Sequence, residues 1–167
     1  MDVSIIKDSS LRIKGNKTAI VIDPLPLKVE AQIAIVTGSS SDISFEKVEG
    51  LKLIIEGPGE YEVGGVSVVV KRIKDDLCFD IVENSKILFI LSSAISKISQ
   101  EEDYDAVIIK VNSKLTEDMF SAINSRLYIL YGDMNLATLK SENVEKTNRV
   151  SLKKAADTSE KIIILGQ

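Results

Sequence analysis

The chain contains no histidine, no tryptophan and only one cysteine, Cys78, in 167 residues. Without imidazole, no histidine is available as a catalytic base, a catalytic acid or a metal ligand. One cysteine and no histidine exclude the usual tetrahedral zinc site of nitrogen and sulfur ligands within one chain, so we expect no cofactor, and no zinc in particular. A single cysteine also excludes an internal disulfide, and we therefore expect a reducing, cytoplasmic location.

Basic charge and aromatic side chains are scarce as well. The formal net charge is −4, the sequence pI is about 5.0 and aromatic residues make up 5% of the chain. Nucleic-acid binding depends on a basic stripe or an aromatic platform, so we do not expect a nucleic-acid partner. No apolar run approaches the roughly 18 residues that span a bilayer, and no basic amphipathic helix is evident. The opening "MDVSIIKDSS" lacks the order of a signal peptide, and we expect no membrane association.

Short β-rich runs are what the chain does contain. Its length suits one domain with its own core, residues 1–167. Strands are predicted at residues 3–6, 11–14, 18–22, 33–36, 53–56, 66–73, 77–82, 86–91, 106–111, 127–131 and 161–165. The segment "KGNK" at 14–17 predicts a hairpin. A helix is predicted after Thr116, with Glu117 and Asp118 in its first turn. Strands followed by alternating strands and helices indicate a layered α/β sandwich.

Two sequence motifs resemble catalytic signatures without completing them. "GPGEYE" at 57–62 has Glu62 where a dinucleotide-binding loop needs glycine, and a strand follows it instead of a helix. Pro58 and Gly59 favour a type II turn there. Three S-x-x-K matches occur without the partner motifs that give this pattern its chemistry. We therefore expect no catalytic residue from these motifs.

Aspartates follow several predicted strands. Asp8, Asp23, Asp42 and Asp133 each lie at or just after a strand end, where their carboxylates could meet at one sheet edge. Carboxylate oxygens are the ligands that Mg²⁺ and Ca²⁺ prefer, and Mn²⁺ accepts them too. Aspartate is also a favoured turn residue because it hydrogen-bonds its own backbone. Both readings of these four residues remain open.

Several segments resemble metallo-β-lactamase-fold hydrolases, especially the ascorbate-6-phosphate-lactonase-like branch. The opening "VSIIKDSSLRIKGNKTAIVIDP" is similar to the family's first strands, which end in Asp-Pro. "IEGPGEYEVGGVSV" at 55–68 is the most specific match. "TGSSSDI" at 37–43 holds the place of the family's S-H-x-H-x-D-H loop, and "ILFILSS" and "LYILYGD" resemble later strands. The resemblance implies a four-layer αββα sandwich, reduced in size.

The same resemblance maps the family's metal site onto residues that are poor metal ligands. Members use a zinc-activated water to open lactones, esters or phosphodiesters. Serine hydroxyls are weak zinc ligands, glycine offers no side chain and isoleucine is apolar. Only one ligand in the "TGSSSDI" loop keeps its identity, the aspartate. The vestigial positions that the resemblance implies are Asp8, Gly38, Ser40, Asp42, Ile43, Ser93 and Gly132.

These observations predict a non-catalytic member of the fold, not an enzyme, that binds a small molecule or a protein partner. One alternative is a hydrolase or sensor that depends on Mg²⁺, Mn²⁺ or Ca²⁺ held by Asp8, Asp23 and Asp42, with Asp133 as a further ligand. Another alternative is a structural subunit paired with an active homologue. The apolar strands at 66–70 and 86–91 also leave room for self-association as a homodimer.

Overall fold

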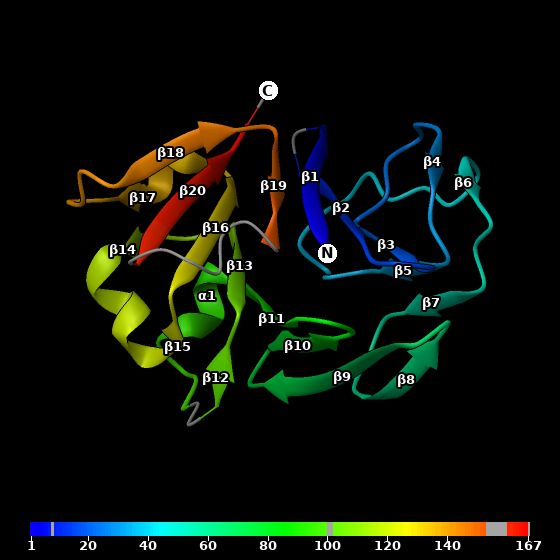
Figure 1. The fold of residues 1–167 in the computed structure, drawn as a ribbon, viewed down its shortest axis with the longest axis horizontal. Coiled ribbons are helices and arrows are strands. Elements are labelled where there is room, and N and C mark those ends of the chain that lie inside the picture. Colours follow the sequence, from blue (N-terminus) through cyan, green and yellow to red (C-terminus); the bar gives the residue numbers. More distant parts are fainter. Residues whose placement is uncertain (8, 100–101, 153–159, 167) are drawn as a thin grey trace.

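Two β-sheets face each other across the core of the computed structural model, which describes residues 1–7, 9–99, 102–152 and 160–166 (Figure 1). The first sheet, sheet A, has six strands in the order β19-β1-β2-β3-β5-β7. Its strands are β1 (Asp2–Lys7), β2 (Ser10–Lys14), β3 (Ala19–Ile22), β5 (Ile33–Ile35), β7 (Leu53–Ile55) and β19 (Arg149–Ser151).

The second sheet, sheet C, has eight strands in the order β18-β20-β16-β13-β11-β10-β9-β8. Strands β8 to β11 pair antiparallel, whereas β11, β13, β16, β20 and β18 pair parallel. The central parallel strands β13 and β16 are mostly apolar because both of their faces are covered. The strands are β8 (Gly59–Val63), β9 (Val66–Ile73), β10 (Asp76–Val82), β11 (Lys86–Leu91), β13 (Ala106–Val111), β16 (Leu127–Gly132), β18 (Val144–Thr147) and β20 (Lys161–Leu165).

Short elements decorate the two sheets. Three two-stranded pairs are β4 (Val29–Glu30) with β6 (Val48–Glu49), β12 (Asp103–Tyr104) with β15 (Asn124–Ser125), and β14 (Leu115–Thr116) with β17 (Ala137–Thr138). The helical segments are α1 (Ser92–Ile95) and the 3₁₀ helices η1 (Glu117–Ala122) and η2 (Met134–Leu136). None of the helices in the described residues is long and apolar enough to cross a membrane.

Alternation along the strands divides the apolar side chains into three clusters. The main core lies between the sheets, where the rings of Phe79 and Phe89 meet edge to face with centroids 5.7 Å apart. A second cluster covers the other face of sheet C and includes Ile95 of α1 and Phe120 of η1. The third cluster lies on the outer face of sheet A around Val21. Successive strand residues point to opposite faces, so both faces of each sheet are packed.

The predicted strands and hairpin agree with these elements. Lys14 of β2 pairs with Ala19 of β3, and the Gly15 N–H donates to the Thr18 carbonyl at 2.9 Å, which closes the predicted turn. Cys78 is buried in β10, as packing residues are. Gly59 has a φ of 156°, well away from the roughly 80° of a type II turn, so this turn differs from the predicted one.

The outer layers of the sandwich differ from the expected αββα arrangement. The predicted helix after Thr116 forms as the 3₁₀ helix η1. Among the described residues, the helical segments pack on the outer face of sheet C. The third cluster, on the outer face of sheet A, instead includes Val29 of β4 and Val48 of β6. The two sheets are therefore as expected, while the helical layers are thin.

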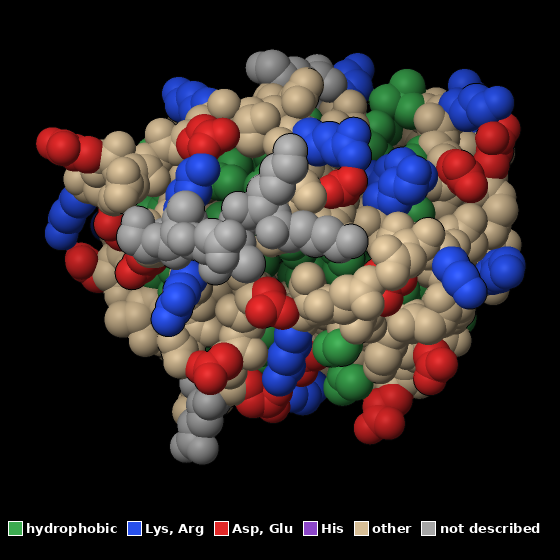
Figure 2. Space-filling view, in the orientation of Figure 1, with side chains coloured by type: hydrophobic (Ala, Val, Ile, Leu, Met, Phe, Trp, Pro, Cys, Tyr) green, Lys and Arg blue, Asp and Glu red, His purple; other side chains and the backbone are tan. Residues whose placement is uncertain are grey.

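The strands suggested for self-association are interior strands. β9 lies between β8 and β10, and β11 lies between β10 and β13, so both edges of each strand are already paired. Val66, Val68 and Val70 are buried in the main core. A second copy therefore cannot add to either strand edge to edge, and self-association as a homodimer stays a prediction. The face in Figure 2 intersperses acidic and basic side chains.

Candidate functional site

The centre of the site is a carboxylate at the end of β3. Asp23 follows the last strand residue and adopts a φ of 47°, a left-handed conformation that aspartate tolerates better than most residues. Its N–H donates to the Ile35 carbonyl of β5 at 2.8 Å, which fixes the turn. The side chain is completely buried. A buried carboxylate needs hydrogen bonds and a counter-charge, and Asp23 has both.

The counter-charge is Lys110 of β13, which comes from the opposite sheet. Its Nζ lies 2.5 Å from Oδ2 of Asp23, and only 5% of the lysine side chain is exposed. The two residues are 87 positions apart in the sequence. This ion pair therefore links sheet A to sheet C inside the molecule.

Two hydroxyl groups connect the ion pair to the surface. Thr37, just after β5, donates its N–H to Asp23 Oδ1 at 2.8 Å and its hydroxyl to Oδ2 at 2.6 Å. The hydroxyls of Thr37 and Ser39 are 2.6 Å apart. Because Thr37 has already given its single proton to Asp23, Ser39 must be the donor in this contact. Ser39 is exposed, so an unbroken chain of hydrogen bonds runs from the surface to the buried pair. We call Ser39, Thr37, Asp23 and Lys110 the hydroxyl relay.

A buried tyrosine lies next to the relay. Tyr131 of β16 is fully buried, and its hydroxyl has no hydrogen-bond partner among the described residues. Burial, together with the negative charge of Asp23, raises the pKa of Tyr131 well above its ordinary value. The phenol is therefore neutral beside the carboxylate.

A second polar cluster lies at the same edge of sheet C. The Ser93 hydroxyl donates to Asp76 Oδ2 at 3.0 Å, and the Asn112 side-chain amide donates to the Ser93 hydroxyl at 3.2 Å. Lys97 approaches Asp76 at 3.5 Å. Ser92 is buried and binds the backbone of Asn112 with its hydroxyl. These groups satisfy one another, which indicates that they fix the loop after β13.

The predicted positions in the 37–43 loop do not converge on one point. Gly38 is exposed with a φ of 78°, and Ser40 and Ile43 are half-buried. Asp42 is exposed, and its carboxylate accepts a long 3.4 Å hydrogen bond from Ser41. The loop thus presents hydroxyls and an exposed carboxylate.

The other predicted positions lie apart from that loop in the sequence and have their own local roles. Ser93 belongs to the polar cluster above. Gly132 has a φ of 103°, and a Cβ there would lie 2.7 Å from the Val111 carbonyl oxygen. Asp133 caps η2 by accepting the Asn135 N–H at 3.2 Å. Asp8 lies outside the described residues.

Zinc does not fit the groups at this site. Within the described part of the chain, no three His, Cys, Asp or Glu side chains come together in a way that could hold a metal ion. The buried carboxylate of Asp23 is already bound by the Lys110 ammonium and by Thr37. A metal cation bound to Asp23 would lie next to the buried Lys110 ammonium, and the repulsion between these two positive charges is unfavourable. No chemistry through zinc follows from these residues.

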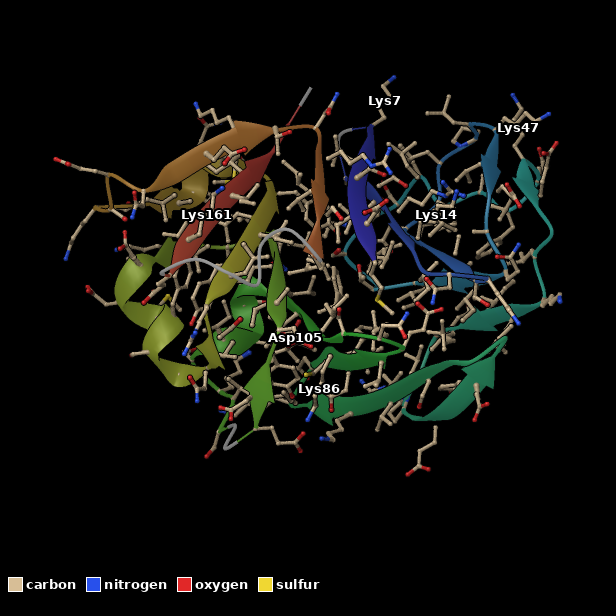
Figure 3. The ribbon with its side chains drawn as sticks, in the orientation of Figure 1. Lys7, Lys14, Lys47, Lys86, Asp105 and Lys161 are labelled. Carbon is tan, nitrogen blue, oxygen red and sulfur yellow. The ribbon has the colours of Figure 1, made fainter. Side chains whose placement is uncertain are left out.

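A cavity of about 610 Å³ lies elsewhere. It is lined by residues that precede β11, β13 and β16, including Asp105, so it lies at the opposite strand ends from Lys110. The Lys86 N–H donates to Asp105 Oδ2 at 2.7 Å, and Figure 3 shows these two residues close together. This cavity is separate from the hydroxyl relay.

Sequence reasoning identified Asp23 but not its partners. Lys110 is a lone charge inside the apolar run "AVIIKV", and a charge in a buried strand must be paired, so this signal was present. Thr37 and Ser39 lie in the 37–43 loop, where the prediction considered only the positions that match metal ligands of the family. Tyr131 carried no signal beyond its place in an apolar strand.

No family model and no curated relative matches the chain. Solved structures do match its fold. A candidate Zn-dependent hydrolase of the metallo-β-lactamase superfamily from Thermotoga maritima superimposes with a TM-score of 0.73 at 15% identity, covering 99% of this chain and 98% of that one. The isothiocyanate hydrolase from Delia radicum gut bacteria gives 0.54 at 12% identity, covering 98% and 96%. The metallo-β-lactamase fold protein YhfI from Bacillus subtilis gives 0.52 at 9% identity, covering 99% and 96%.

These comparisons correct one expectation. The chain was expected not to be an enzyme, because histidine ligands are missing from the sequence. The solved structures that share its fold include hydrolases, and nothing in the described residues is positive evidence of inactivity. The absence of histidine excludes catalysis that needs histidine-bound zinc. It does not exclude catalysis by an exposed hydroxyl that is hydrogen-bonded toward a buried carboxylate. The chain has the metallo-β-lactamase fold.

Proposed function

We propose that this chain is a hydrolase that cleaves a small ester or lactone with the Ser39 hydroxyl as nucleophile and without a metal cofactor. The observation that carries the proposal is the hydroxyl relay, in which an exposed serine is joined through Thr37 to the buried Asp23–Lys110 pair. Serine is a weak nucleophile until an adjacent base accepts its proton, and the relay provides that path.

The reaction follows from the direction of these hydrogen bonds. Oγ of Ser39 attacks the acyl carbon, and its proton moves to Thr37 Oγ1 while the Thr37 proton moves to Asp23 Oδ2. The bond between the acyl carbon and the alkoxy oxygen then breaks, and the proton returns through the relay to the leaving alkoxide. Water repeats the same steps on the acylated serine and releases the carboxylic acid.

Lys110 provides the electrostatic component. The Asp23–Lys110 pair is neutral overall before attack and carries one positive charge once Asp23 is protonated. The tetrahedral intermediate carries one negative charge on its oxygen at the same moment. Protonation of Asp23 leaves the buried ammonium without its counter-charge, so attraction between this ammonium and the new oxyanion, which bulk water screens little, must offset that cost.

The substrate class rests on the sequence resemblance. The segment at 55–68 is similar to the ascorbate-6-phosphate-lactonase-like branch, and this supports membership of that branch and a lactone as substrate. The single buried cysteine supports work in the reducing cytoplasm. The partner in this proposal is a small molecule, with no nucleic acid and no membrane.

Covalent labelling of Ser39 tests the proposal directly. The purified chain, dialysed against EDTA, is treated with an alkyl fluorophosphonate and digested for mass spectrometry. Hydrolysis of p-nitrophenyl acetate and of γ-butyrolactone is followed in parallel. We expect one phosphonyl group on Ser39 and activity that survives EDTA. Ser39→Ala is expected to reduce both to background, and Thr37→Val to slow them by about 100-fold.

Ser41→Ala is the matched control, because Ser41 is an exposed serine of the same loop whose hydroxyl donates to Asp42. It is expected to keep wild-type labelling and turnover. Turnover that vanishes with EDTA and returns with zinc would contradict the proposal, as would labelling at any other serine. A chain that neither labels nor hydrolyses either substrate would contradict it too.

A further inference from the structure

We infer that the Lys110 ammonium is a built-in cation that takes the place of a metal ion between the two sheets. This inference goes beyond the proposed function, because it concerns which charge the centre holds and does not depend on Ser39 as a nucleophile. A solved structure with the same fold is described as Zn-dependent. In this chain, the positive charge at the centre is the ammonium of a lysine side chain.

Four segments from both sheets supply the polar groups around this charge. Asp23 follows β3 and Thr37 follows β5, both in sheet A. Lys110 and Tyr131 are direct register partners on the neighbouring parallel strands β13 and β16 of sheet C, so their side chains lie on the same face. A carboxylate and two hydroxyls therefore gather near one ammonium, in a region where all four side chains are buried.

The charge balance of the centre explains why an external cation is excluded. Asp23 brings one buried negative charge, and Lys110 neutralises it at 2.5 Å. Because the ammonium is covalently attached, it has no translational freedom to lose, and a free ion must displace it from the carboxylate. Displaced, the ammonium would be left buried without a counter-charge.

Removal of the ammonium should convert this centre into a site for a free cation. Lys110→Ala leaves the Asp23 carboxylate, the Thr37 hydroxyl and the Tyr131 hydroxyl around the space that the lysine side chain filled. A small alkylammonium ion restores the missing charge and part of the missing volume. Mg²⁺ or Zn²⁺ brings two positive charges and restores little of the volume. Lys110→Met fills most of that space with an uncharged chain and should bind neither.

Thermal unfolding of the wild type, Lys110→Ala and Lys110→Met tests this, in ethylammonium chloride, in MgCl₂ and in NaCl of equal ionic strength. We expect both variants to melt about 10 °C below the wild type. Ethylammonium should return at least half of that loss to Lys110→Ala and none to Lys110→Met. Lys47→Ala is the control, because Lys47 is exposed and lies far from β13 at the edge of the molecule (Figure 3). It should melt like the wild type in every buffer.

Metal content gives a second readout that does not require a folded Lys110 variant. After equilibrium dialysis against zinc, the wild type should contain no stoichiometric zinc that depends on Asp23. One equivalent of zinc lost on Asp23→Asn would overturn the inference. So would a Lys110→Met protein as stable as the wild type, or a folded Lys110→Ala protein that ignores ethylammonium.

Two further variants keep the inference distinct from the proposed function. If Lys110→Ala does not fold, Asp23→Asn with Lys110→Met removes both charges and should be more stable than either single variant. A less stable double variant would count against a charge-neutralising role. Ser39→Ala should leave zinc exclusion and the melting temperature unchanged, whatever happens to hydrolysis.

Discussion

The hydroxyl of Tyr104 donates to Oδ1 of Asp80 at 2.7 Å, and Lys71 binds the other carboxylate oxygen at 3.0 Å. Asp80 is an acid in the apolar strand β10, only 7% exposed, on the face of sheet C opposite the main core. Burial first, and then the bond to Asp80, raises the pKa of Tyr104 above its ordinary value. A buried acid is thus satisfied here by a phenol and an ammonium.

Tyr104→Phe should destabilise the protein by about 1.5–3 kcal/mol, because it removes a hydrogen bond to a charged, buried acceptor. Urea unfolding followed by circular dichroism measures the change. Tyr61→Phe is the matched control, since its hydroxyl donates to the Gly57 carbonyl at 3.0 Å in a partly exposed turn. It should cost about 1 kcal/mol or less. Equal losses in the two variants would mean that Asp80 contributes nothing special.

Asp23→Asn should cost about 3–5 kcal/mol, because it leaves the Lys110 ammonium buried without a counter-charge. Asparagine tolerates the left-handed backbone at this position, so the loss reports the charge and not the turn. Urea unfolding measures it. Glu49→Gln breaks the pair between Lys28 and Glu49, both of which are well exposed, and should leave stability nearly unchanged. A loss at Asp23 no larger than at Glu49 would refute the expectation.

Gly132→Ala should destabilise the fold by at least about 2 kcal/mol. The φ of 103° strains any side chain, and the new Cβ would meet the Val111 carbonyl oxygen at 2.7 Å. Gly57→Ala provides the comparison, because a Cβ there meets nothing within 4 Å. It should lie within about 0.5 kcal/mol of the wild type. Equal melting temperatures for these two variants would show that the backbone at 132 relaxes freely.

Stability should fall as the pH rises above about 10, because buried tyrosines resist ionisation. Burial raises the pKa of Tyr128 to about 12 and holds the pKa of Tyr131 well above its ordinary value. Between the unfolded and folded pKa values, the folded state binds more protons than the unfolded state. The stability that these tyrosines contribute is therefore complete below the unfolded pKa and is lost as the pH rises through the folded pKa. Urea unfolding at pH 9, 10 and 11 measures the slope.

Tyr128→Phe serves as the control for this pH dependence and should make the alkaline slope shallower. Absorbance at 295 nm offers an independent measurement, because phenolate from the buried rings should appear together with unfolding. Phenolate from Tyr128 in a chain that remains folded at pH 10 would contradict the assignment.

Periodicity predicted the two sheets well because burial on a pleated surface leaves a direct trace in the sequence. The run at 33–36 is apolar throughout and the run at 106–111 is apolar apart from Lys110, and β5 and β13 are buried on both faces. The outer layers were harder to predict. Thr116 and the acids after it indicated a helix, but six residues form only a 3₁₀ helix, and short segments depend on tertiary contacts more than on propensity.

The candidate site was predicted only at Asp23. Its partners come from segments 14 and 87 residues away, and no local pattern encodes such pairings. Lys110 was visible as a charge in an apolar strand, which shows that a partner must exist without showing which one. The missing histidines directed the prediction to positions where a metal ligand would lie. In the structure, the Asp23 carboxylate is instead joined to the surface through the hydroxyls of Thr37 and Ser39.

The pairing of β19 with β1 has a consequence for biosynthesis. Val3 of the first strand pairs with Val150, and the Leu152 N–H donates to the Met1 carbonyl at 3.0 Å (Figure 1). While a ribosome is still making the chain, sheet A lacks its outermost strand until codon 151 has been translated and its residue has left the exit tunnel. Pairing between residues so far apart in the sequence slows folding, so sheet A is completed only after most strands of sheet C have been synthesised.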